Sequence, residues 1–130
     1  MSEPYRIRLR GPWEVRPHVA GFPAGRTEVP GTLRAGGWAG YAGPATFFRR
    51  FGKPSNLGTT DRVRLAFAGV TGRAEIRLNG EAVGAIDGSG AIDVTERLRE
   101  RNELEVEVDA ANDECGIVGN VVIEIAADSQ

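Results

Sequence analysis

The sequence predicts an all-β sandwich or barrel. Several short segments alternate apolar and polar residues with a period of two, which is typical of a strand with one face in the core and one in water. Eighteen glycines and seven prolines separate these segments, as expected for strands joined by tight turns. The 130 residues fit one domain with a core of ordinary size. We therefore expect a single domain over residues 1–130.

The alternation is strictest in residues 62–67, 74–78 and 103–108. Their inward-facing residues are Val63, Leu65, Phe67, Ala74, Ile76, Leu78, Leu104, Val106 and Val108. Their outward faces carry arginines against glutamates, which favours pairing between neighbouring strands. We expect further strands at residues 5–9, 46–51, 91–94 and 121–125, with Phe47 and Phe51 in the same core.

Two segments depart from the strand pattern. Residues 93–99 read as one or two helical turns, which Thr95 is expected to cap. Residues 18–43 are rich in glycine, proline and alanine and show little periodicity. Because strand patterns resume on both sides, we interpret this segment as a long crossover within the domain.

Asn79 and Gly80 lie between two apolar segments in RLNGEAVG. Asparagine and glycine both tolerate positive φ, which a two-residue type I′ hairpin turn demands. The pair is therefore expected to form a tight turn with both residues at positive φ.

The bulk composition limits the function classes. A formal charge of −2 provides no net attraction to nucleic acid or to an anionic membrane, so neither is an expected partner. The first ten residues hold no apolar signal-peptide core. A single cysteine, Cys115, fits a reducing compartment. A cytoplasmic location is therefore the expectation.

The ordered series of segments resembles a known family. The segments are FFRRF at residues 47–51, DRVRLAFAGV at residues 61–70, AEIRLNG at residues 74–80, IDVT at residues 92–95 and NELEV at residues 102–106. Together they are similar to the N-terminal sugar-binding domain of glycoside hydrolase family 2, the β-galactosidase and β-glucuronidase family. The resemblance implies a jelly-roll sandwich of the galactose-binding-like type. In that family hydrolysis belongs to a separate barrel with two catalytic glutamates, so no catalytic activity is expected here.

No residue of this chain stands in a recognisable catalytic or metal-binding pattern. His18 is the only histidine and has no nucleophile motif nearby. Cys115 lacks the second cysteine of a metal or redox motif. Asp87 with its neighbouring glycines is a weak candidate for Ca²⁺, since no cluster of oxygen ligands accompanies it. We expect no catalytic residues, no metal and no cofactor.

A carbohydrate site needs aromatic rings and hydrogen-bonding side chains. Trp38 and Tyr41 in the crossover either stack on a sugar or plug the end of the sandwich. The resemblance places three segments near one another: residues 35–43 of the crossover, the 87–90 turn and the 112–115 loop. Asp87, Asn112 and Asp113 are then candidate partners for sugar hydroxyls, and Asp113 is the nearest match to an acidic residue of the family.

Arg49 alternates in phase with Phe47 and Phe51 and so is expected to face the core. The resembling family keeps an arginine at this place. A core-facing arginine needs a carboxylate or several carbonyls, so Arg49 either forms a bracing ion pair or contacts a ligand.

Three functions remain open from the sequence. The first is a non-catalytic sandwich that binds a carbohydrate weakly through loops at one end. The second is an interaction or oligomerisation module with no sugar site. The third is an accessory piece of a split glycoside hydrolase, in which the partner is a separate catalytic subunit.

Overall fold

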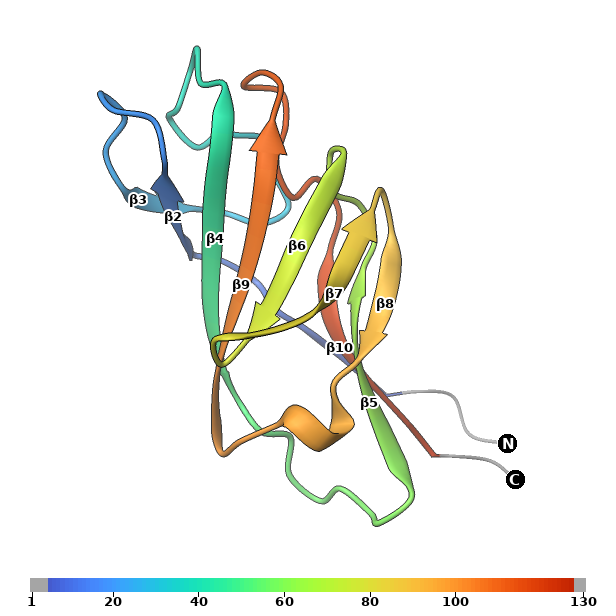
Figure 1. Cartoon of the computed structure of the whole chain (residues 1–130). Helices are drawn as coiled ribbons and strands as arrows, with labels where there is room; N and C mark the ends of the chain where they lie inside the picture. Colours follow the sequence, from blue (N-terminus) through green and yellow to red (C-terminus); the bar gives the residue numbers. More distant parts are fainter. Residues whose placement is uncertain (1–4, 128–130) are drawn as a thin grey trace.

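The computed structural model describes residues 5–127 and consists almost entirely of strands (Figure 1). In chain order these are β1 (Tyr5–Arg8), β2 (Trp13–Pro17), β3 (Gly25–Thr27), β4 (Gly43–Gly52), β5 (Asp61–Phe67), β6 (Arg73–Leu78), β7 (Glu81–Asp87), β8 (Gly90–Asp93), β9 (Arg101–Ala110) and β10 (Val121–Ala127). A 3₁₀ turn, η1 (Thr95–Arg97), connects β8 to β9. The predicted all-β class is confirmed.

The strands form two antiparallel sheets that pack face to face (Figure 1). Within the described residues, one sheet has four strands in the order β1-β10-β5-β8 and the other has six in the order β3-β2-β4-β9-β6-β7. The longest pair is β4 with β9, in a register that places Phe47 opposite Val106. The non-sequential strand order fits a galactose-binding-like β-sandwich.

The core lies between the sheets and follows the period-two pattern. Ten apolar side chains predicted to face inward are at most 2% exposed: Phe47, Val63, Leu65, Phe67, Ala74, Ile76, Leu78, Leu104, Val106 and Val108. Phe51 is the exception, since it is only half-buried. It lies near the end of β4, where the strand leaves the sandwich and fewer neighbours cover the ring.

Two strands were not expected from the sequence. β2 follows Pro12 and ends at Pro17, and it carries its own inward pair, Trp13 and Val15, both fully buried. β3 lies inside the segment interpreted as an irregular crossover. Its three residues are too few to show a period of two, so only the pairing with β2 reveals it.

The expected helical turn is shorter than predicted, and Thr95 does not cap it. The Thr95 hydroxyl instead accepts a 2.8 Å hydrogen bond from the Val63 amide on β5. Asp93 accepts bonds from both the amide and the hydroxyl of Thr95, at 3.0 and 2.8 Å. Arg62 joins this cluster through two bonds to Asp93, at 3.0 and 3.1 Å. These hydrogen bonds attach the segment to β5. The part of the chain that the structure describes contains no helix with the length and apolarity needed to cross a membrane.

Asn79 and Gly80 form the predicted two-residue turn between β6 and β7. Their φ angles are 55° and 85°. The Asn79 side chain also accepts a 2.9 Å bond from the Glu103 amide on β9 and donates a 3.1 Å bond to Asn102. The asparagine therefore fastens the turn to the neighbouring strand as well as permitting its backbone conformation.

Replacing Gly80 by valine should lower the free energy of unfolding by about 1–3 kcal/mol, because a β-branched residue resists positive φ. Nothing lies within 4 Å of the position that a β-carbon would take, so the loss would come from the backbone and not from a clash. Urea unfolding of the wild type and of Gly80→Val measures it. Gly80→Asn is the control and should be much milder, since asparagine tolerates this conformation. Equal losses in both variants would contradict the backbone explanation.

Arg49 does not form the bracing ion pair that the sequence suggested. Its guanidinium donates a 2.8 Å bond to the Arg10 carbonyl and a second bond to the Arg50 carbonyl. Within residues 5–127 it makes no ion pair. Because the side chain is only half-buried near the end of β4, carbonyl oxygens suffice and no carboxylate is required.

Candidate functional site

Two of the three loops expected to lie together, the crossover and the loop after β9, meet at the end of the sandwich drawn at the top of Figure 1, whereas the 87–90 turn lies to the right of them, beyond the β5–β6 loop. The Arg34 amide donates to the Asp113 carbonyl at 2.8 Å, which joins the crossover to the loop after β9. Thr71 donates to the Gly116 carbonyl at 3.0 Å and Val70 to the Gly88 carbonyl at 2.6 Å. The loop between β5 and β6 therefore links the 87–90 turn to the other two.

Trp38 and Tyr41 are not stacking platforms. Their exposed fractions are 5% and 1%, so neither ring offers a face to a sugar. The Trp38 indole donates a 2.8 Å bond to the Pro23 carbonyl, and the Tyr41 hydroxyl donates to the Pro44 carbonyl. The stacking interpretation is wrong, and the alternative, that both rings plug the end of the sandwich, agrees with the structure.

Asp113 is also a structural residue. Its side chain is buried, accepts a 2.6 Å bond from the Gly40 amide and pairs with Arg34 at 3.2 Å. The Gly40 hydrogen bond, assisted by the Arg34 guanidinium, holds the Asp113 pKa below its ordinary value and outweighs the opposing effect of burial. A lowered carboxyl pKa stabilises the fold above the unfolded-state pKa of about 3.9, and this contribution is lost as the pH falls. Asp113 therefore fastens two loops to each other.

Asp87 and Asn112 remain exposed at this end. The side-chain oxygen Oδ1 of Asn112 accepts a 2.9 Å bond from the Glu114 amide within its own loop, which leaves the side-chain NH₂ group for other partners. Asp87 ends β7. Within residues 5–127 no three side chains of the His, Cys, Asp and Glu types gather to hold a metal ion. Cys115 is buried, and His18 contacts the Thr46 hydroxyl at 2.8 Å.

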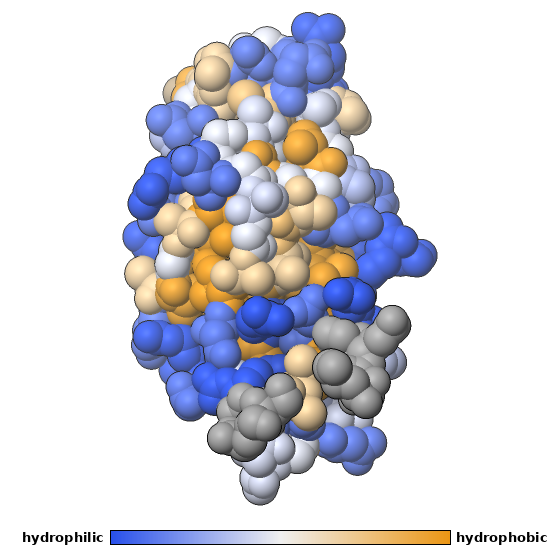
Figure 2. All heavy atoms as spheres, turned by 90° about the vertical axis from the view of Figure 1, so that its right-hand side faces the viewer, coloured by the Kyte–Doolittle hydropathy of each residue, from blue (hydrophilic) through white to orange (hydrophobic). Residues whose placement is uncertain are grey.

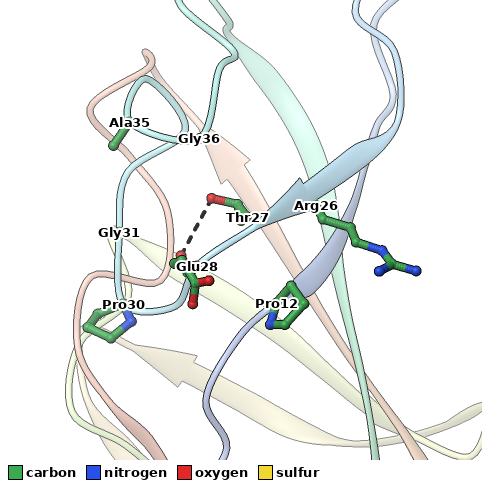
Figure 3. A pocket seen from close by; sticks show the side chains of 8 residues that line it. All are labelled: Pro12, Arg26, Thr27, Glu28, Pro30, Gly31, Ala35 and Gly36. Carbon is green, nitrogen blue, oxygen red and sulfur yellow. Dashed lines mark hydrogen bonds between the residues drawn. The ribbon is translucent and has the colours of Figure 1, made fainter.

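A hollow of about 390 Å³ lies beside the crossover (Figure 3). It is lined by Pro12, Arg26, Thr27, Glu28, Pro30, Gly31, Ala35 and Gly36. Its walls come from the entry to β2, from β3 and its exit, and from the first residues of the 35–43 crossover. Sequence reasoning did not find it, because it depends on the unpredicted strand β3.

Trp38 supports this hollow from behind. A β-carbon at Gly36 would stand 2.7 Å from the indole, and one at Gly25 would stand 3.2 Å from it. The two glycines therefore let the crossover and β3 close over the ring. The tryptophan shapes the wall that faces the hollow without reaching solvent.

The hollow holds two charged side chains with free bonding capacity. Within residues 5–127, neither Arg26 nor Glu28 forms an ion pair or a side-chain hydrogen bond, and both are exposed. The Glu28 carboxylate lies against Gly11, where a β-carbon would come within 2.6 Å of Oε2. Figure 3 shows the Glu28 carboxylate between Pro30 and Pro12, while Arg26 lies beyond Pro12 and extends away from the other lining residues. The acceptor therefore lies between the two exposed prolines, and the donor fork lies to one side of them.

The fold and its end loops define a galactose-binding-like β-sandwich. The profile of the family described as glycosyl hydrolase 2 galactose-binding domain-like matches residues 37–116. The chain belongs to that family. No curated protein matches the sequence.

Solved structures share the fold at low sequence identity. A β-glucuronidase from Bifidobacterium dentium, complexed with coumarin-3-O-glucuronide, superposes with a TM-score of 0.83 at 19% identity, over 98% of this chain and 31% of that one. An FMN-binding β-glucuronidase from Faecalibacterium prausnitzii L2-6 gives 0.79 at 23%, over 95% and 23%. A putative β-galactosidase from Bacteroides fragilis gives 0.78 at 19%, over 97% and 24%. The chain thus spans less than a third of each of these proteins.

Proposed function

We propose that this domain is a non-catalytic module that binds carbohydrate weakly in the hollow beside the crossover. The observation that carries the proposal is that Arg26 and Glu28, both uncommitted within the described residues, line the same 390 Å³ hollow. Sugar hydroxyls donate to a carboxylate and accept from a guanidinium. The exposed prolines supply apolar surface for the C–H groups of a pyranose.

The expected affinity is on the order of millimolar. The hollow is open to solvent, and a shallow site gains little beyond the cost of immobilising its ligand. Membership of the galactose-binding-like family supports carbohydrate as the ligand class. The hollow lies beside the crossover, and Trp38, Tyr41 and Asp113 are not among the residues that line it.

The test is an NMR titration of the ¹⁵N-labelled domain with galactose, glucose and their methyl glycosides, preceded by a glycan array. Glu28→Gln should weaken binding about tenfold, because a charged acceptor is worth about 1.5–3 kcal/mol. Glu100→Gln is the matched control, since Glu100 is exposed and does not line the hollow. No hydrolysis of aryl galactosides or glucuronides is expected in the same samples.

Two results would count against this site. Loss of binding in Asp87→Asn or Asn112→Ala, with Glu28→Gln unaffected, would move the site to the end loops. No shift with any sugar would remove the carbohydrate proposal.

A second candidate is docking against another domain or chain, either a copy of this chain or a catalytic subunit. Figure 2 shows a band of apolar atoms on the side where β7 and β8 form the edges of the two sheets. Val83 on β7 and Ile92 on β8 are only partly buried there. Light scattering measures the solution mass, and a monomer at all concentrations would oppose self-association.

A further inference from the structure

Three hollows lie in series along the outside of the sandwich. The hollow beside the crossover, of about 390 Å³, shares Pro12 and Arg26 with a second of about 280 Å³ over β2 and β4. The second shares Arg50 and Glu103 with a third of about 530 Å³, between the end of β4, the β6–β7 turn and the start of β9. We call this series of neighbouring hollows the trough. A fourth hollow, of about 110 Å³, adjoins the second at Phe48 and is acidic, with Glu75, Glu105 and Glu107 in its lining.

The three hollows of the trough carry more arginines than glutamates, on a chain whose formal net charge is −2. The residues lining it include five arginines and three glutamates, namely Arg16, Arg26, Arg49, Arg50, Arg101, Glu14, Glu28 and Glu103. Two of the arginines are paired within the trough: Arg16 with Glu14 at 2.7 Å and Arg50 with Glu103 at 3.4 Å. Within residues 5–127, Arg26 and Arg101 have no acidic partner, so a guanidinium near each end is free to bind an anion.

Each of the two outer-sheet hollows also contains a phenylalanine of β4. Phe48 lies in the second hollow with the Arg16 guanidinium stacked 4.2 Å from its ring centre, an arrangement that fixes the orientation of the guanidinium donors. Phe51 lines the third hollow and is half-buried, but it alternates in phase with Phe47 and packs against the core. Because side chains three residues apart on a strand point to opposite faces, Phe48 is the ring that the outer face offers to a sugar.

The asparagines at the far end shape the trough and have little capacity left for a ligand. Asn102 is 2% exposed and bonds to the Arg99 amide at 2.9 Å and the Arg99 carbonyl at 2.8 Å. Asn79 is committed to Asn102 and to the Glu103 amide. Recognition in the third hollow therefore falls to the arginines and Glu103.

We propose that the trough binds an acidic oligosaccharide, with sugar carboxylates on Arg26 and Arg101 and the chain lying across the Arg50–Glu103 pair. This deepens the proposed function, on which it rests, by naming the ligand class and extending the site. Guanidinium forks match carboxylates bidentately. The interspersed glutamates accept from hydroxyls between the carboxylates, whereas they would repel the closely spaced phosphates of nucleic acid.

The test compares three probes by calorimetry and NMR: trigalacturonic acid, its fully methyl-esterified form, and galacturonic acid. The trimer should bind at least about tenfold more tightly than the ester, since the ester lacks charge-assisted bonds of about 1.5–3 kcal/mol. The preference should decrease as salt is added. A single-stranded DNA oligonucleotide serves as the polyanion comparison.

Variants locate the ligand along the trough. Arg101→Gln should weaken trimer binding about tenfold and leave galacturonic acid binding unchanged, because the monosaccharide occupies the hollow beside the crossover. Arg99→Gln is the matched control, an exposed arginine nearby that does not line the hollows. Thermal melting confirms that each variant is folded.

Each outcome decides a different point. Equal binding of trimer and ester would overturn the acidic-ligand inference and leave the proposed carbohydrate function standing. Trimer binding unaffected by Arg101→Gln would overturn the extended trough. DNA that binds more tightly than the trimer would replace the ligand class, and no binding of any sugar would remove both proposals.

Discussion

Replacing Trp38 by alanine should lower the free energy of unfolding by about 3–5 kcal/mol, the range for removing a buried large aromatic side chain. The indole is 5% exposed, packs against Gly25 and Gly36, and donates to the Pro23 carbonyl at 2.8 Å. Alanine would leave a cavity beneath two backbone segments and a carbonyl without its donor. Urea unfolding monitored by circular dichroism measures the loss.

Trp38→Phe separates packing from hydrogen bonding. Phenylalanine restores much of the apolar volume but cannot donate to Pro23, so the expected loss is about 1–3 kcal/mol. In a Trp13→Phe background, Trp38 becomes the only tryptophan, and its emission maximum should be that of a buried indole. A loss below about 1 kcal/mol for Trp38→Ala, with emission typical of an exposed ring, would restore the interpretation of Trp38 as a stacking platform.

The strands predicted from the sequence are those in which apolar and polar side chains alternate over several adjacent residues. Residues 62–67 alternate because one face of β5 packs on the core and the other meets water, so burial can be read from a few adjacent residues. β3 has only three residues and is held in a strand conformation by its pairing with β2. Because this pairing involves residues elsewhere in the chain, the local sequence of β3 does not reveal it.

The burial of Trp38 and Asp113 was missed for a related reason. Asp113 and Gly40 are 73 positions apart in the chain, and the Trp38 indole finds its acceptor 15 positions earlier. A loop aromatic and a loop acid look available in the sequence because their partners are distant. The turn at Asn79 and Gly80 was predictable because it requires positive φ only at these two adjacent residues, whose types tolerate it. The arginines of the trough were visible as residues, but only the sheet register and the end of β4 bring Arg50 beside Glu103.

Arg49 shows the limit of arguing from alternation alone. The period of β4 predicts an inward-facing side chain, and a fully buried guanidinium needs a carboxylate or several carbonyls. The strand reaches the end of the sandwich at this point, so Arg49 is half-buried and finds the Arg10 carbonyl at 2.8 Å. Depth within the core is a property of the whole fold, and two residues with the same phase can lie at different depths.

Phe67→Ala should cost about 3–5 kcal/mol, from the lost burial of the ring and from the cavity that remains. Phe67 is 2% exposed at the end of β5, where it pairs with Val121 on one side and Gly90 on the other. Strands on both sides restrain the backbone, so the site has little freedom to collapse into the cavity. Urea denaturation of wild type and variant gives the difference directly.

The control for Phe67 lies three residues away on the opposite face of the same strand. Arg64 is exposed and pairs with Glu124 at 2.8 Å, so Arg64→Ala removes only a surface interaction worth about 1 kcal/mol or less. The ratio of the two losses reports which face of β5 packs against the six-stranded sheet. Comparable losses in the two variants would mean that the inward face of β5 has been assigned incorrectly, and the assignment of Val63 and Leu65 to the core would fail with it.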